Sequence, residues 1–334
     1  MKKIHIVDTT LRDGSHALSH TFTATDVVKI AQGLDQSGVE FIEISHGDGI
    51  NGSSYNYGFM KTSEIELLKA ANKVIKNAKL TVLLLPGIGT VEDLKYVYNH
   101  CGVKAVRVAT HVSEADISKQ HIEAAKELGM IAVGFLMLAH MATPEEIVEQ
   151  AKLMESYGAD YINIADSAGH LLPENVSKII KAVSDALSIP VGFHAHNNLA
   201  LAMGNTLAAI EAGATYVDGT LCGLGAGAGN TQLEVLAGVL DLKGLDSGLD
   251  FYQLMDIAKD AVTPIMKRPQ IIDEDSLMVG YAGVYSSFFL HVKNAAKKFQ
   301  LESRDILVEL GKRKMVGGQE DMIIDVAYQL SQKK

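Results

Sequence analysis

Two histidines separated by one residue, His194 and His196, form the motif of this sequence that most directly suggests chemistry. They end a short apolar run that begins at Val191 and is typical of a β-strand. Since neighbouring side chains of a strand point to opposite faces, both imidazoles would share one face, with Ala195 on the other. Two imidazoles at this spacing can bind one metal ion, although two packed histidines of a core or loop would give the same pattern.

A second polar group, Arg12, Asp13 and His16, follows the strand-like run at residues 4–9. Asp13 could add a carboxylate to the two histidines, and two imidazoles with one carboxylate make a metal site with open coordination positions. Arg12 beside that metal would stabilise an enolate, and a structural ion pair is its alternative role. His16 is a candidate proton carrier, with a solvent-exposed loop histidine as the alternative.

Short apolar runs alternate with stretches of helical period, which predicts βα units and a parallel sheet. The eight runs are residues 4–9, 39–45, 80–85, 105–110, 131–138, 161–165, 191–196 and 215–221. Eight such units favour an α/β fold of the closed (β/α)8 TIM-barrel type, with an eight-stranded open sheet as the alternative. In a barrel the active site lies at the carboxyl ends of the strands, and only the eighth strand separates the seventh from the first, so Asp13 can reach both histidines.

The pattern changes after residue 244, where residues 251–266, 285–299 and 321–330 read as helices without intervening strands. We therefore expect a TIM-barrel catalytic domain over residues 1–244 and a helical, partner-binding C-terminal subdomain over residues 245–334. The polar insertion at residues 47–59, rich in Gly and Asn, is too long for an ordinary βα loop. It could cover the mouth of the barrel.

Two further features fall at strand ends. Ser167, after the sixth strand, could donate a hydrogen bond to a substrate carboxylate or could cap the following turn. Residues 223–229, after the eighth strand, contain alternating glycines whose backbone amides suit an anionic ligand, a tight turn being the alternative. No Gly-Lys-Ser/Thr follows, so a phosphate loop is excluded in favour of a carboxylate or a structural role.

The composition limits the function classes. Hydrophobic residues make up 47% and charged residues 21%, as in average globular proteins, and a net charge of -10 argues against nucleic acid as a partner. The two cysteines lie far apart, which excludes a disulfide framework and a cysteine-rich zinc site and fits the cytoplasm. We see no leader pattern and no apolar run of roughly 20 residues, so we expect no membrane association.

Residues 10–14 and 194–198 resemble the DRE-TIM metallolyase superfamily. Stretches along nearly the whole chain narrow the resemblance to the 4-hydroxy-2-oxovalerate aldolase family: residues 12–16, 46–49, 83–89, 113–116, 152–158, 225–230, 280–287 and 314–325. One departure concerns Asn197, where the family carries a histidine. Because that side chain would face away from the two histidine ligands, the departure puts only the surroundings of the metal in doubt.

The resemblance implies a divalent-metal-dependent class II pyruvate aldolase of aromatic hydrocarbon catabolism, which cleaves the 2-oxoacid 4-hydroxy-2-oxopentanoate to pyruvate and acetaldehyde. It implies that Asp13, His194 and His196 bind the metal, usually Mn²⁺, with Mg²⁺ or Co²⁺ as alternatives. His194 would also lie against the bound substrate, whose carboxylate and ketone oxygens chelate the metal.

The same resemblance implies roles for other residues. Arg12 would bind the substrate and stabilise the pyruvate enolate, and Ser167 would help to hold the carboxylate. His16 would be the base at the C4 hydroxyl, and Tyr285 would lie near the substrate and the aldehyde exit. Without the resemblance, Tyr285 would be read as a packed aromatic residue of the C-terminal region.

The family also pairs with an acylating acetaldehyde dehydrogenase through its C-terminal region and passes acetaldehyde through an internal channel. The nearest alternative function is another DRE-TIM lyase or an acyl-CoA-using synthase, such as a hydroxymethylglutaryl-CoA lyase or a citramalate synthase. Non-haem iron oxygenases use the same ligand set on a different β-scaffold. A structural or regulatory subunit of a dehydrogenase complex is the non-enzymatic alternative.

Overall fold

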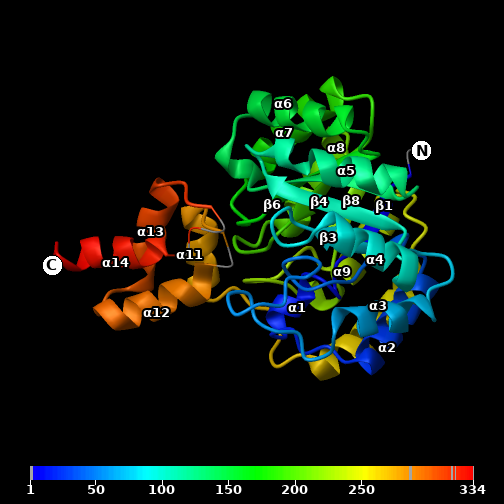
Figure 1. The fold of residues 1–334 in the computed structure, drawn as a ribbon, viewed down its shortest axis with the longest axis horizontal. Coiled ribbons are helices and arrows are strands. Elements are labelled where there is room, and N and C mark those ends of the chain that lie inside the picture. The colour runs from blue at the N-terminus through cyan, green and yellow to red at the C-terminus, as the bar shows by residue number, and fades with distance from the viewer. Residues whose placement is uncertain (1–2, 286–287, 317–318, 320, 334) are drawn as a thin grey trace.

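The chain forms a closed barrel of eight parallel strands, which are arranged in sequence order. Figure 1 shows helices around these strands, with the C-terminal helices to one side. The computed structural model describes residues 3–285, 288–316, 319 and 321–333. The barrel closes through β1 and β8, whose register runs from His5 opposite Tyr216 to Asp8 opposite Gly219. This pairing confirms the predicted (β/α)8 fold and excludes an open sheet.

Each predicted strand is present, with ends that differ by a few residues. The strands are β1 (His5–Asp8), β2 (Phe41–Glu43), β3 (Lys79–Leu84), β4 (Ala105–His111), β5 (Ile131–Met137), β6 (Tyr161–Asp166), β7 (Val191–Ala195) and β8 (Tyr216–Gly219). Along β4, Val106 and Val108 belong to the main hydrophobic core, whereas the intervening Arg107 faces the interior of the barrel. The strand alternation therefore places Arg107 inside the barrel while its two valine neighbours pack against the helices.

Helices follow the strands and cover the outside of the barrel. They are α1 (Gly14–Ala17), α2 (Ala24–Gln36), α3 (Glu64–Asn72), α4 (Val91–Cys101), α5 (Lys119–Glu127), α6 (Pro144–Ser156), α7 (Pro173–Ala186), α8 (Ala202–Ala212) and α9 (Leu233–Leu242), with short 3-10 turns at Ala115–Ser118, Ala139–Met141 and Leu221–Gly223. A capping box begins α6, because the Thr143 hydroxyl accepts from the Glu146 N–H and Glu146 accepts from the Thr143 N–H. Among the described residues, no helix is long and apolar enough to span a bilayer.

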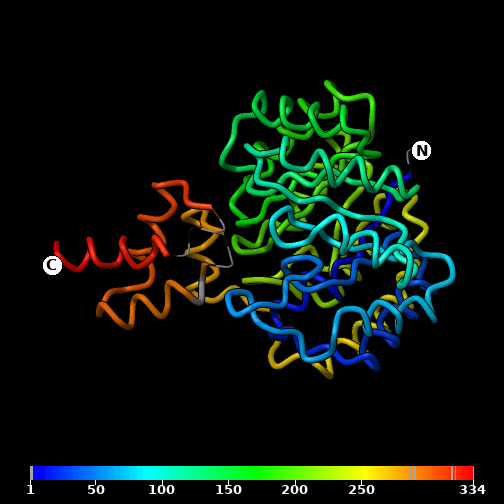
Figure 2. The backbone as a smooth tube through the Cα atoms, in the orientation of Figure 1, coloured from blue at the N-terminus to red at the C-terminus, as the bar shows by residue number. Residues whose placement is uncertain are grey.

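The C-terminal helices divide between two hydrophobic cores. α10 (Phe251–Ile257) continues into the π-helical segment Ala258–Val262 and the 3-10 turn Thr263–Ile265, and Leu254 and Val262 belong to the barrel core. The helices α11 (Glu274–Ala282), α12 (Phe289–Phe299), α13 (Ser303–Lys312) and α14 (Met322–Ser331) surround a second core, which begins at Val279. Figure 2 shows these four helices as a separate lobe beside the barrel.

The expected domain boundary at residue 244 does not coincide with this packing. α10 lies against α2 and α9 of the barrel, so the separately packed helices begin only at α11. The sequence analysis also missed α11 and α13. α11 lacks a clear amphipathic stripe, because Leu277 and Tyr281 are exposed while Val279 is buried on the same short helix. The predicted helix over residues 285–299 begins at Phe289, and residues 286–287 lie outside the described part of the chain.

Candidate active site

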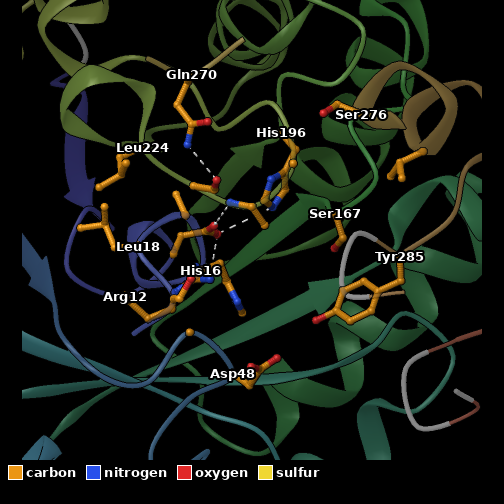
Figure 3. A pocket seen from close by; sticks show the side chains of 18 of the residues that line it. Arg12, His16, Leu18, Asp48, Ser167, His196, Leu224, Gln270, Ser276 and Tyr285 are labelled. Carbon is orange, nitrogen blue, oxygen red and sulfur yellow. Dashed lines mark hydrogen bonds and ion pairs between the residues drawn. The ribbon is translucent and has the colours of Figure 1, made fainter. Parts of the chain in front are cut away.

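A cavity of about 620 Å³ opens at the carboxyl ends of the barrel strands, where a TIM barrel carries its active site. The insertion at residues 47–59 contributes Gly47, Asp48, Asn56 and Tyr57 to its wall, so this loop lies at the mouth as expected. Every candidate residue of the sequence analysis lines this cavity: Arg12, Asp13, His16, Ser167, His194, His196 and Tyr285 (Figure 3).

Three ligand-type atoms converge at the bottom of the cavity. Oδ2 of Asp13 lies 3.4 Å from Nε2 of His194 and 3.7 Å from Nε2 of His196, and the two Nε2 atoms are 3.4 Å apart. All three side chains are buried. Atoms that bind one ion at about 2.0–2.2 Å lie roughly 3 Å or slightly more from one another, so this arrangement fits a divalent metal.

Neighbouring groups orient these ligand atoms. Nδ1 of His194 lies 2.8 Å from the Asp218 carboxylate and donates to it, which leaves Nε2 directed toward Asp13. The other oxygen of Asp13, Oδ1, accepts from the backbone N–H of Ala226 at 3.0 Å. The glycine-rich loop therefore holds a carboxylate of the protein itself. Gly225 is required there, since a Cβ atom would lie 2.5 Å from Oδ1 of Asn230.

The protonation states suit metal binding. Burial alone would raise the pKa of Asp13, but Arg12, His196 and His194 hold this pKa well below its ordinary value. Burial lowers the pKa of His196 to about 4, against the attraction of Asp13. Burial also opposes a charge on His194, yet its hydrogen bonds to Asp13 and Asp218 raise its pKa. Asp13 is thus ionised and His196 neutral, as metal ligands must be, and the carboxylates beside His194 favour a positive charge at this place.

Two of the metal ligands, Asp13 and His194, belong to a closed circuit of buried ion pairs, which we call the charge ring. Its members are Asp13, Arg12, Glu43, Arg107, Asp218 and His194. Arg12 donates from Nε to Glu43 at 2.7 Å and from Nη1 to Asp13 at 2.8 Å. Arg107 contacts Glu43 at 2.9 Å and Asp218 at 2.5 Å.

Sequence reasoning missed Glu43, Arg107 and Asp218. The available signal was a charged residue within each of three otherwise apolar strands. Arg12 forms the structural ion pairs of its alternative role, and its second terminal nitrogen, Nη2, is buried without a hydrogen-bond partner among the described residues. That nitrogen can donate to a ligand in the cavity.

The three other candidate residues lie around the metal ligands. His16 is in α1, half-buried rather than on an exposed loop, and its ring lies against Gly47, where a Cβ atom would be 2.5 Å from Nε2. The Ser167 hydroxyl accepts from the N–H of Leu138 at 3.1 Å. Tyr285 directs its hydroxyl into the cavity (Figure 3), and burial raises the pKa of this phenol, which therefore stays protonated.

Two other histidines near the mouth of the barrel, His46 and His140, contact groups other than the metal ligands. His46 stacks on His20 beneath the insertion, with ring centroids 3.8 Å apart. His140 instead donates to the carbonyl of Gly283 at 2.9 Å, and so contacts the end of α11 rather than the metal ligands.

Comparisons with known proteins agree with this geometry. The HMGL-like family model matches residues 3–261, and the DmpG-like communication domain matches residues 270–332. Two proteins named 4-hydroxy-2-oxovalerate aldolase are similar: one of Moorella thermoacetica, 67% identical over 100% of this chain and 98% of its own, and one of Carboxydothermus hydrogenoformans, 62% identical over 99% and 98%. The carboxyl transferase domain of Rhizobium etli pyruvate carboxylase has the same fold, with a TM-score of 0.83 and 20% identity over 100% of this chain and 61% of that one. The chain therefore belongs to the 4-hydroxy-2-oxovalerate aldolases of the HMGL-like family, which are carbon–carbon lyases.

Proposed function

We propose that this enzyme performs the metal-dependent retro-aldol cleavage of 4-hydroxy-2-oxopentanoate to pyruvate and acetaldehyde at the cavity described above. The observation that carries the proposal is the convergence of one carboxylate and two imidazoles within 3.4–3.7 Å, beside a guanidinium with an unpartnered nitrogen. The names of the similar proteins support the substrate.

Asp13, His194 and His196 would hold the cation. Their set of one oxygen and two nitrogen ligands suits Mn²⁺, which we propose as the physiological metal, with Mg²⁺ or Co²⁺ as alternatives. When bound, such a cation polarises the ketone of the substrate and shares the negative charge of the enolate. The carboxylates around His194 provide the negative surroundings that retain it.

The protein's own residues would carry out the proton transfer, stabilise the enolate and position the substrate. His16 accepts the proton of the C4 hydroxyl, which becomes the aldehyde as the C3–C4 bond breaks. The electron pair of that bond stays with the pyruvate fragment as an enolate, and Arg12 donates to its oxygen through Nη2. The enolate then takes up one proton at C3, which forms the pyruvate methyl group and balances the proton that His16 removed from the hydroxyl. Ser167 would help to hold the carboxylate and the protonated hydroxyl of Tyr285 would face the aldehyde, roles that the presence of both side chains in the cavity wall supports.

A pyruvate assay with 4-hydroxy-2-oxopentanoate, run after chelation and after metal is added back, tests this function. We expect chelation to abolish pyruvate release and Mn²⁺ to restore it without coenzyme A and without oxygen consumption. A requirement for coenzyme A would favour a synthase or acyl-CoA lyase, and oxygen uptake would favour an oxygenase. Full turnover by the chelated chain would contradict the metal-dependent mechanism.

We also propose an acylating acetaldehyde dehydrogenase as the partner of helices α11–α14. The match to a communication domain supports this partner, and so do exposed aromatic residues on these helices, Tyr281 at 68% and Tyr328 at 55% exposure. Co-elution of the two proteins in size-exclusion chromatography would test it, and a Tyr281→Asp, Tyr328→Asp variant should elute alone.

The unpaired Cys101 and Cys222 fit our proposal of a cytoplasmic enzyme.

A further inference from the structure

A second group of metal-type ligands lies beside the cavity and shares no residue with the first. It consists of His16, His20 and Asp48, and one ligand atom of each lies within 4.8 Å of the other two. His20 and Asp48 are each only 6% exposed, and His16 is half-buried. His16 and Asp48 line the cavity, and Figure 3 shows the His16 ring extending from α1 on the side where Asp48 lies.

The imidazole of His20 has an unused nitrogen. Its Nδ1 atom is buried and has no hydrogen-bond partner among the described residues. The ring of His46, stacked on it, uses both nitrogens, since Nδ1 accepts from the Asp48 N–H at 3.1 Å and Nε2 donates to the Gly58 carbonyl at 3.2 Å. A buried polar atom without a partner destabilises the fold, so Nδ1 of His20 marks a place where a ligand would be favourable.

The protonation state of His20 suits a metal ligand. Burial lowers its pKa to about 3, and the neighbouring His16 and His46 lower it further, against a hydrogen bond to the Tyr57 backbone. The ring is therefore neutral, as an imidazole that binds a metal must be.

The insertion at the barrel mouth is fitted closely around these rings. A Cβ atom at Gly47 would lie 2.5 Å from Nε2 of His16, and one at Gly58 would lie 3.3 Å from Cδ2 of His20. Glycines at both positions thus let the loop close over the two imidazoles while Asp48 of the same loop faces them. The cluster is held by the fold and is not a chance meeting of surface side chains.

We propose that His16, His20 and Asp48 bind a second divalent cation, of the zinc type. Two imidazoles and one carboxylate with an open fourth position are a donor set that zinc accepts. The ion would occupy the lone pair of His16 and so prevent this residue from accepting the C4 hydroxyl proton. Zinc at this position therefore inhibits the enzyme, a consequence that rests on the role of His16 in the proposed function.

Equilibrium dialysis against zinc, with metal analysis of the protein, tests binding independently of turnover. We expect two zinc ions per wild-type chain, one in the His20→Asn variant, one in the His194→Ala, His196→Ala variant and none when these changes are combined. Asparagine suits position 20 because the backbone there is left-handed, with φ of 57°. His100→Asn, at an exposed histidine, is the matched control and should keep two ions. A His20→Asn chain that still binds two ions, or a wild-type chain that binds one, would overturn the site.

Asp48→Asn is a second test in case His20→Asn does not fold, because it removes only the charge of the carboxylate. It should weaken the second zinc ion at least tenfold, and an unchanged affinity would contradict the assignment. Turnover of the Mn²⁺-loaded enzyme separates the two proposals: zinc should inhibit the wild type at concentrations that fill the second site and should not inhibit His20→Asn at these concentrations. Two bound ions without inhibition would leave the site in place and overturn the role of His16 as the base.

Discussion

The two walls of the cavity are built by different physical means. The barrel wall is the charge ring, in which Arg12 and Arg107 each join two carboxylates in a buried environment. The opposite wall includes Ser276 and Val279 of α11 and the following Tyr285, and hydrogen bonds from two barrel histidines to backbone carbonyls join it to the barrel. His140 donates to the Gly283 carbonyl at 2.9 Å and His170 donates to the Gly280 carbonyl at 2.7 Å.

Because of this difference, the barrel wall positions two of the metal ligands, whereas the wall formed by the C-terminal lobe determines the shape of the cavity. Asp13 and His194 are held by partners within the barrel, namely Arg12, the Ala226 N–H and Asp218, so their positions do not depend on the C-terminal lobe. α11 belongs to the second hydrophobic core but rests against the β7 loop, where a Cβ atom at Gly280 would lie 2.9 Å from Cβ of Asn198. A displacement of the C-terminal lobe would therefore reshape the cavity wall without moving Asp13 or His194.

The largest effect that we expect comes from opening the charge ring at Arg107. Arg107→Met should destabilise the fold by about 3–5 kcal/mol, because it leaves Glu43 and Asp218 buried without their cation. Urea unfolding measures this change. The matched control is Lys126→Met, at an exposed ion pair with Asp160, which should cost no more than about 1 kcal/mol. If both variants lowered the free energy of unfolding equally, the charge ring would contribute no more to stability than a surface ion pair.

Arg12→Lys should come next and should affect catalysis rather than binding. Lysine keeps the charge, but it cannot donate to Glu43, Asp13 and the substrate in the planar geometry of a guanidinium. We expect kcat to fall about 10²–10³-fold, as for the loss of one donor to a developing oxyanion. Mn²⁺ affinity, measured by titration, should change little. A normal kcat would remove Arg12 from the proposed mechanism.

Asp218→Asn should weaken the metal site without abolishing it. The amide no longer supplies the negative charge that orients His194 through its Nδ1–H, and loss of such a partner typically lowers metal affinity about 10–100-fold. Isothermal titration with Mn²⁺ measures this effect. At saturating metal, kcat should largely recover, and an unchanged affinity would show that His194 does not need this partner.

The smallest effect should come from the contact between barrel and lobe at His140. Burial lowers the pKa of His140 to about 4, and its ordinary value is 6.5, so the unfolded chain binds more protons between these values. This histidine therefore contributes stability at neutral pH that is lost as pH falls from about 7 toward 4. Gln at position 140 keeps an N–H donor for Gly283 but does not titrate. Both proteins should melt at a lower temperature at pH 5 than at pH 7. We expect this decrease in melting temperature to be about 2 °C smaller in His140→Gln than in the wild type.

Much of the architecture could be predicted from local patterns. The short apolar runs predicted eight strands, since a βα repeat is visible in hydrophobic period alone. The shared face of His194 and His196 also followed locally, because it depends only on the two-residue period of a strand. Position after a strand also singled out His16 and Ser167, whereas only the resemblance to a family added Tyr285. All three line the same cavity, and their individual roles stay predictions.

The partners of these residues depended on strand register and on loop packing. Glu43, Arg107 and Asp218 come from three different strands, and which charges meet inside the barrel is set by how the strands are staggered. The grouping of His20 with Asp48 likewise arises only when the insertion folds over α1. A sequence pattern specifies which face of an element a side chain occupies, but the neighbour across the interior comes from the closure of the whole sheet.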